Sequence, residues 1–177
     1  AIINNFAPLL FLTFQNTYNI PLGQITLLVT INFSVQLIVD LLSARFVDKI
    51  GYKVSVVAAH IAAAIGIMGL GVFPELFADP YTGLLLAISI YAVVGGLIEV
   101  LVSPIVEACP TENKPAVMSL LHSFYCWGHV LVVLCSTLFF VVFGINNWRI
   151  LAFIWAGVPL LNAIYYSQVP IASLNED

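Results

Sequence analysis

The stretch VVGGLIEVLVSP, residues 93–104, is apolar apart from Glu99, its single charged residue. A charge near the centre of a bilayer costs about 2.5–3.5 kcal/mol on insertion scales, so an acid in such a run usually has a function. Gly95 and Gly96 lie just before the acid, and small residues of this kind let another helix or water approach closely. The stretch therefore indicates a membrane-spanning helix that carries one candidate functional acid.

The whole chain has the composition of a membrane protein. Of its 177 residues, 62% are hydrophobic and only 8% are charged, and the mean hydropathy is +1.07. A soluble domain carries about 25% charged residues, so the chain has too few charges to cover a surface that faces water. Its 5 basic residues make no basic face, which argues against a nucleic-acid partner. Because Cys109, Cys126 and Cys135 lack the spacing of a metal site or disulfide framework, we expect no metal and no cofactor.

Apolar segments, each near the ~20 residues that a spanning helix needs, follow one another along the chain. We expect six helices, over residues 1–17, 22–45, 53–73, 81–109, 116–143 and 148–169. The polar breaks between them are short, so consecutive helices should lie antiparallel. The first segment is short, as if its start were missing. The expected architecture is an all-α bundle of six transmembrane helices over residues 1–170, followed by a polar tail over residues 171–177.

The basic residues predict the orientation of this bundle in the membrane. Arg45, Lys49 and Lys53 flank the second break and Lys114 lies in the fourth, whereas only Arg149 lies near the other breaks. Because loops rich in Lys and Arg stay in the cytoplasm, we expect both termini to be cytoplasmic. We expect a multi-pass protein of a cell membrane, specifically the bacterial inner membrane.

The two expected three-helix units share one feature. The first helix of each unit has a polar residue followed shortly by proline: Asn4 before Pro8, and Glu99 before Pro104. Breaks at corresponding positions of two halves are typical of inverted repeats in transporters. An ordinary proline kink in each helix explains the pattern equally well. We expect two three-helix inverted repeats, which would make the chain half of a twelve-helix transporter.

The segment SARFVDKIGYK, residues 43–53, follows the second expected helix on the basic side of the membrane. It resembles the loop between helices two and three of the major facilitator superfamily, whose motif reads Gly-x-x-x-Asp-Arg-x-Gly-Arg/Lys-Arg/Lys. The motif is matched by Asp48, Gly51 and Lys53, and Lys49 replaces its arginine. Ala44 and Tyr52 depart from the motif. The resemblance implies a gating role for this loop, together with Glu107 at the inner end of the fourth helix. An ordinary positive-inside loop is the alternative.

The fourth and fifth expected helices narrow the resemblance. Residues 95–128 are similar to the fucose-permease type of sugar–proton symporter, whose fourth helix carries Gly-Leu/Cys-Leu-Glu-x-x-x-Asn-Pro. Glu99 and Pro104 match this pattern, and Ser103 replaces its asparagine. The fifth helix of that group reads Leu-Asn-x-x-Gln-x-Phe-Asn-x-x-Gly. Here the residues at its three amide positions are Ser119, His122 and Tyr125, while Phe124 and Gly128 match.

This resemblance implies a function and a set of site residues. The function is secondary active transport of a small polar solute, a sugar or related metabolite, coupled to protons by alternating access. Glu99 would face the central cavity and take up the proton, since desolvation favours the neutral acid. The substrate-cavity candidates are Asn4, Asn5, Gln36, Ser103, Ser119, His122 and Tyr125. The partners are the lipid bilayer, the solute, protons and a second six-helix half, either a missing C-terminal part of the chain or a second copy.

Several alternatives remain open at this point. The symporter group has an acid in helix one, where this chain has Asn4 and Asn5, and an amide cannot release a proton. Either Glu99 works alone, or coupling is absent and Glu99 is a neutral acid bonded to a neighbouring helix. Asp40 on the second helix either belongs to a gate with Arg45 or reaches the membrane surface. The rival functions are a membrane-embedded enzyme, which the absence of HExxH and GxSxG disfavours, and a non-transporting sensor or scaffold with the same fold.

Overall fold

The computed structural model describes residues 1–171, except for the side chain of Ala44. All of the described secondary structure is helical, which confirms the all-α class. The elements are α1 (Ile2–Leu9), α2 (Phe11–Tyr18), α3 (Leu22–Ile50), α4 (Tyr52–Leu76), α5 (Pro80–Ala108), α6 (Lys114–Phe143), the short 3-10 helix η1 (Ile145–Asn147) and α7 (Trp148–Gln168). The predicted polar tail lies outside the described residues from position 172 onward.

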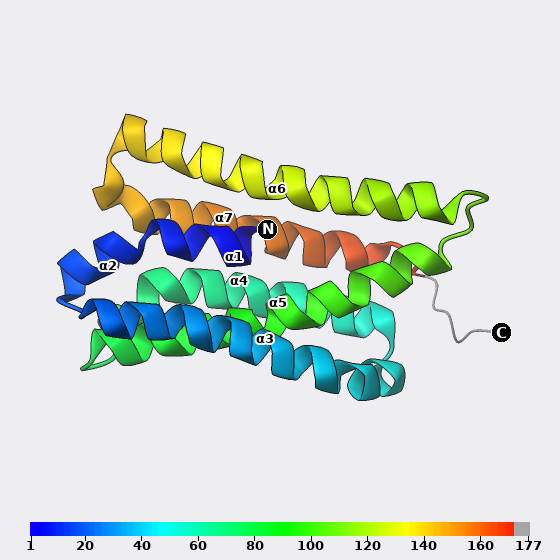
Figure 1. Cartoon of the computed structure of the whole chain (residues 1–177), viewed down its shortest axis with the longest axis horizontal. Coiled ribbons are helices and arrows are strands. Elements are labelled where there is room, and N and C mark those ends of the chain that lie inside the picture. The colour runs from blue at the N-terminus through cyan, green and yellow to red at the C-terminus, as the bar shows by residue number, and fades with distance from the viewer. Residues whose placement is uncertain (172–177) are drawn as a thin grey trace.

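The long helices run side by side and alternate in direction, as the short breaks predicted (Figure 1). The connections α2–α3, α4–α5 and α6–α7 lie at one end of the bundle, which we call the Glu75 end. The connections α3–α4 and α5–α6 lie at the opposite end, which we call the Lys53 end. The α4–α5 connection, with Glu75 and Asp79 beside it, is therefore at the opposite end of the molecule from the α3–α4 and α5–α6 connections, which carry Lys49, Lys53 and Lys114.

Five of the predicted membrane helices are present as long apolar helices. By length and composition, the helical stretches able to cross a membrane among the described residues are Leu22–Ser43, Tyr52–Leu76, Pro80–Ala108, Lys114–Phe143 and Ile145–Gln168. The protein is thus a multi-pass membrane protein.

The first predicted helix, over residues 1–17, is not continuous in the structure. It is divided at Leu10 into the short helices α1 and α2. Pro8 lies in the last turn of α1, where it lacks an N–H group and its ring crowds the carbonyl of Asn4, four residues earlier. The prediction of one unbroken helix is therefore wrong. Pro8, for which an ordinary kink was one interpretation, lies two residues before the break at Leu10.

The second expected helix, over residues 22–45, is longer in the structure, because α3 continues through Ile50 and α4 starts at Tyr52. The turn consists of Gly51 alone, with φ at +94°, a backbone conformation that side chains rarely allow. The N–H of Gly51 donates to the carbonyl of Val47 at 2.8 Å, which closes the last turn of α3. The charged residues of the motif therefore lie on helix ends and not in an extended loop.

The packing leaves one side of the bundle open. Helices α4 and α5 approach so closely that a Cβ atom added at Gly66 would lie 2.8 Å from the Cβ of Tyr91. Tyr91 and its neighbours join a buried apolar cluster that includes Phe6, Phe14 and Leu84. Helix α6 stands apart, because most of its side chains are exposed. The side between α3 and α6 is therefore the open one.

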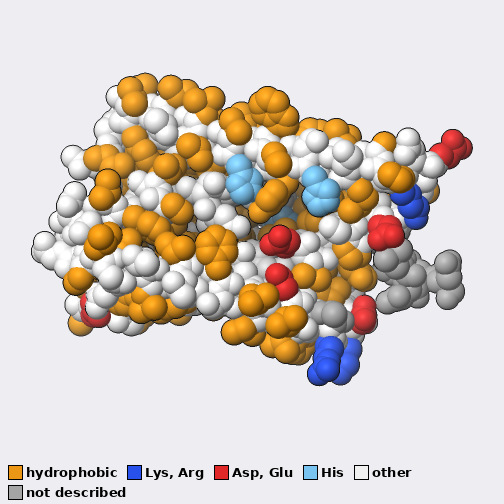
Figure 2. Space-filling view, in the orientation of Figure 1, with side chains coloured by type: hydrophobic (Ala, Val, Ile, Leu, Met, Phe, Trp, Pro, Cys, Tyr) orange, Lys and Arg blue, Asp and Glu red, His pale blue; other side chains and the backbone are white. Residues whose placement is uncertain are grey.

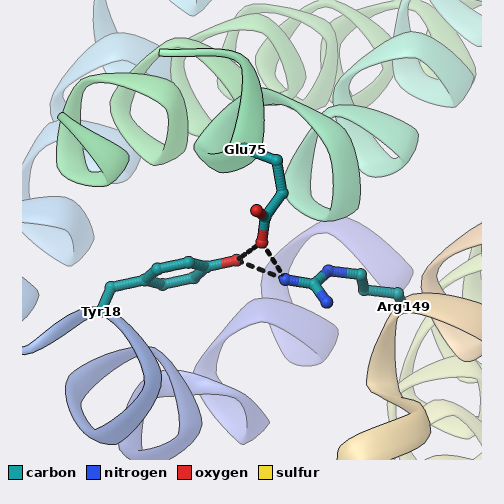
Figure 3. A network of polar contacts seen from close by, with 3 residues as sticks. All are labelled: Tyr18, Glu75 and Arg149. Carbon is teal, nitrogen blue, oxygen red and sulfur yellow. Dashed lines mark hydrogen bonds and ion pairs between the residues drawn. The ribbon is translucent and has the colours of Figure 1, made fainter. Parts of the chain in front are cut away.

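A polar cluster joins three helices at the Glu75 end (Figure 3). A guanidinium nitrogen of Arg149 on α7 donates to the hydroxyl of Tyr18 on α2 at 2.9 Å and forms an ion pair with Glu75 on α4. The Tyr18 hydroxyl in turn donates to the same Glu75 oxygen at 3.1 Å. Since the charged side chains are 39% and 57% exposed, this ion pair contributes no more than about 1 kcal/mol. It fixes helix ends and lies outside the cavity described next.

Candidate solute cavity

Two adjoining hollows lie between α1, α3, α5 and α6. The small cavity has a volume of about 220 Å³ and is lined by Ala1, Ile3, Asn4, Gly95, Ile98, Glu99, Val102, Ser103, Leu121, His122 and Tyr125. The large cavity has a volume of about 510 Å³ and is lined by Asn4, Asn5, Phe33, Gln36, Leu37, Asp40, Glu99, Tyr125 and His129. Histidine side chains and some of the acidic side chains lie midway along this face, while other acidic side chains lie at its ends and the Lys and Arg side chains seen on it lie at the Lys53 end (Figure 2).

Glu99 lies where the two cavities meet, because its side chain lines both. Gly95 and Ser103 line the small cavity on the same side of α5, one turn before and one turn after the acid. The side chain of Glu99 is exposed, so its carboxyl group is reached from the open side of the bundle. The structure places this side chain at the two cavities, and its role in proton uptake stays a prediction.

Helix α3 approaches α5 at a glycine beside this acid. A Cβ atom added at Gly96 would lie 2.8 Å from the backbone oxygen of Gln36 and 3.1 Å from Oδ1 of Asp40. Real Cβ contacts are essentially never that short, so only glycine fits between the two helices here. The close approach brings the polar residues of α3 to the same cavity as Glu99.

Buried amides tie α1 to α3 behind the large cavity. Nε2 of Gln36 donates to Oδ1 of Asn4 at 2.8 Å and to Oδ1 of Asn32 at 3.1 Å. Nδ2 of Asn32 lies 3.4 Å from the same Asn4 oxygen. Gln36 and Asn32 are only 6% and 8% exposed, and a buried amide without a partner would be costly. The mutual bonds therefore hold these amides in one arrangement.

A second polar contact joins α1 to α6. Nδ2 of Asn5 lies 2.8 Å from Nδ1 of His129 and also donates to the backbone oxygen of Ala1 at 2.7 Å. An amide nitrogen only donates, so Nδ1 is the acceptor and the neutral ring carries its proton on Nε2. This Nε2 is buried and has no partner among the described residues. The ring of Tyr125 packs edge-on against His129 at 4.4 Å between centroids.

Most of the predicted cavity residues lie together in the structure. Those lining one or both cavities are Asn4, Asn5, Gln36, Glu99, Ser103, His122 and Tyr125. Ser119 is the exception, because it is exposed on α6 and is absent from both linings. Its carbonyl accepts a hydrogen bond from Ser123 at 2.9 Å, as expected for neighbours one turn apart.

The residues of the loop motif lie elsewhere, at the Lys53 end of the bundle. Asp48 and Lys49 belong to the last turn of α3, and Lys53 belongs to the first turn of α4. At the same end, Nζ of Lys114 donates to the carbonyl oxygen of Glu107 at 2.7 Å, which links the end of α5 to the start of α6. These residues are separate from the cavity, so any gating role acts through helix ends.

Sequence reasoning did not assign Asp40 to the cavity. It was expected to join a gate with Arg45 or to reach the membrane surface, and the structure shows that its side chain lines the large cavity. Its Oδ1 is buried and has no hydrogen-bond partner among the described residues. The spacing of Asn32, Gln36 and Asp40, each four residues from the next, could have revealed it, because this spacing puts all three on one side of a helix.

The fold and the cavity define a multi-pass membrane protein with a polar, solute-sized hollow between its helices. Among the described residues, no group of three or more His, Cys, Asp or Glu side chains is arranged to hold a metal ion. A family model described as Major Facilitator Superfamily matches residues 1–174, so the chain belongs to this superfamily of membrane transporters. Comparisons with curated proteins and with solved structures gave no match.

Proposed function

We propose that the chain is the N-terminal six-helix half of a secondary active transporter that moves a small polar solute together with protons. The observation that carries the proposal is the position of Glu99, whose carboxyl group opens into a cavity lined by four helices. In a protein of this superfamily, an acid at such a place can bind a proton and contact the solute from one cavity.

The chemistry of the cavity suits a solute rich in hydroxyl groups. Its walls offer amides on α1 and α3, a hydroxyl on Ser103, and ring nitrogens and a phenol on α6. The ring of Tyr125 is exposed to both cavities and provides a surface on which the apolar side of a sugar ring can stack. We therefore propose a sugar or related metabolite as the solute.

Proton coupling follows from the charge of Glu99. A charged carboxylate in a membrane interior is costly, and a neutral one is much less so. A conformational change that moves Glu99 between water and a closed interior therefore favours the protonated form in the closed state. The solute binds the protonated form of Glu99, so solute and proton cross together, and the emptied transporter returns after both have left. This account needs only Glu99 and an alternating-access motion.

The open side of the bundle fits a second six-helix half. The polar groups of the cavity need a cover inside a membrane, because they are unfavourable in contact with lipid. Transporters bind solutes near the bilayer midplane between two repeats, so the second half would form the opposite wall. It is either a further part of the chain or a second copy.

Two further features belong to the proposal. We propose that α1 and α2 together form the sixth span, so that the units α1–α4 and α5–α7 make two inverted repeats. In support, α1 and α5 run in opposite directions, and their polar residues Asn4 and Glu99 line the same cavity (Figure 1). We also place the Lys53 end, toward which the start of α1 and the end of α7 point, in the cytoplasm of a cell with an inner membrane, since this end carries most of the basic residues.

Replacement of Glu99 by glutamine tests the proposal, because it keeps the shape and removes the titrating proton. The complete transporter, reconstituted in liposomes, is assayed with a panel of radiolabelled monosaccharides. Glu99→Gln should abolish accumulation driven by a pH gradient and retain exchange of the same sugar across the membrane. Glu112→Gln, at an exposed acid between α5 and α6, is the matched control and should behave as the unmodified protein. Accumulation by Glu99→Gln against a gradient would refute the role of Glu99.

A further inference from the structure

The carboxyl group of Asp40 is the one acid of the large cavity that the proposed function leaves unused. Asp40 lies on α3, one turn beyond Gln36, and its side chain lines the cavity together with Glu99. Oδ1 is buried, and no donor among the described residues bonds to it. A buried carboxylate oxygen without a donor is unfavourable, so the environment of Asp40 needs an explanation.

The groups that face Asp40 come from all of the helices around it. Helix α5 contributes the backbone at Gly96 and the carboxyl group of Glu99. Helix α1 contributes the neutral amides of Asn4 and Asn5, and α6 contributes the phenol of Tyr125 and the ring of His129. None of the residues that line the large cavity is Lys or Arg.

Two acids that line one cavity without a basic side chain repel each other when both are charged. Like charges in one site favour the protonated form of one of them. A protonated carboxyl group is also a donor, so it can bond to water or solute in the cavity. The large cavity, at about 510 Å³, has room for water that brings the proton to either acid.

We propose that Asp40 is a second proton-binding group of the cavity and that it titrates together with Glu99. A proton from cavity water bonds to a carboxylate oxygen of Asp40, and the same O–H bond breaks when the proton returns to water on the other side. No oxidant or other reactant takes part. The use of this proton in transport rests on the proposed function, but the binding of the proton does not.

Infrared spectroscopy of the purified complete transporter tests proton binding without any transport assay. The carbonyl stretch of protonated carboxyl groups is recorded through a pH titration, and the spectrum of Asp40→Asn is subtracted from that of the unmodified protein. The difference should contain one protonated carboxyl band, and the pH midpoint of this band should shift in a Glu99→Gln background. In a Glu112→Gln background the midpoint should stay the same.

Two results would overturn the inference: no protonated band assignable to Asp40, or a midpoint that is the same with and without Glu99. Asp40→Glu keeps the acid and should keep the band, which separates loss of the proton from loss of the fold. Failure of this inference and failure of the proposed function are distinguishable. A titrating Asp40 band in a protein that moves monosaccharides without protons rejects only the proposed function, and proton-driven uptake without such a band rejects only the role of Asp40.

Discussion

Replacement of Gly96 by alanine tests the helix contact on which the cavity depends. The added Cβ atom would lie 2.8 Å from the backbone oxygen of Gln36 and 3.2 Å from its Cα. Both atoms belong to the main chain of α3, so no side-chain rotation relieves the contact. Oδ1 of Asp40, at 3.1 Å from the same point, would also have to move. Helix α3 must therefore shift away from α5, and the polar groups of the large cavity shift with it.

The size of the effect follows from comparison with Gly157 on α7, where an added Cβ atom meets nothing within 4 Å. Alanine in place of glycine inside a helix stabilises by roughly 0.5–1 kcal/mol at either position. Only Gly96→Ala carries the additional cost of overpacking, about 1–3 kcal/mol. The free energy of unfolding of Gly96→Ala should therefore lie about 1–3 kcal/mol below that of Gly157→Ala, since the helix-propensity gain cancels.

Unfolding in mixed micelles of increasing denaturing detergent, followed by far-ultraviolet circular dichroism, measures this difference. Gly157→Ala should unfold at the same or a higher fraction of denaturing detergent than the unmodified protein, and Gly96→Ala at a lower one. Equal free energies of unfolding for the two variants would mean that α3 and α5 do not touch at Gly96. The placement of Asp40 beside Glu99 would then be wrong as well.

Other predictions concern the two ends of the bundle. With the native cysteines replaced, cysteines introduced at Glu75 and Lys114 should react with impermeant reagents from opposite sides of the membrane, and labelling from the same side contradicts the topology. Gly51→Ala should lower the free energy of unfolding by roughly 1–3 kcal/mol because of the positive φ, and an unchanged unfolding curve would disprove this strain. Asp48→Asn should reduce monosaccharide uptake in liposomes, and full uptake removes the gating role. Tyr18→Phe should cost less than about 1 kcal/mol because its network is exposed, and a larger loss in the same unfolding assay argues against that view.

Much of the fold could be predicted because a bilayer imposes strict rules on the sequence. Apolar runs of spanning length predicted α3 to α7, and the basic residues marked the Lys53 end. The division of the first segment at Leu10 and the continuation of α3 through Ile50 were missed. Hydropathy reports which residues prefer lipid, but a helix ends where its backbone bonds end, and polar residues such as Asp48 can continue a helix into water.

The candidate cavity was predictable in part, because the resemblance to the fucose-permease group pointed to residues on single helices. Glu99 and Ser103 follow one face of α5, and the structure brings them together with Asn4 and His122. The position of Asp40 depends on how closely α3 approaches α5, which is set by Gly96 in another segment of the chain. A contact between residues so far apart in the sequence leaves no local signal. The bond between Asn5 and His129 is of the same kind.

The most direct test of the central proposal is the movement of protons that accompanies solute in liposomes. The complete transporter is reconstituted with a pH-sensitive dye inside, and a gradient of a transported monosaccharide is applied with no initial pH difference. The account predicts that protons enter with the sugar, so that the interior becomes acidic, and that Glu99→Gln abolishes this change while sugar exchange continues. Entry of sugar into liposomes of the unmodified protein with no change in internal pH would contradict it.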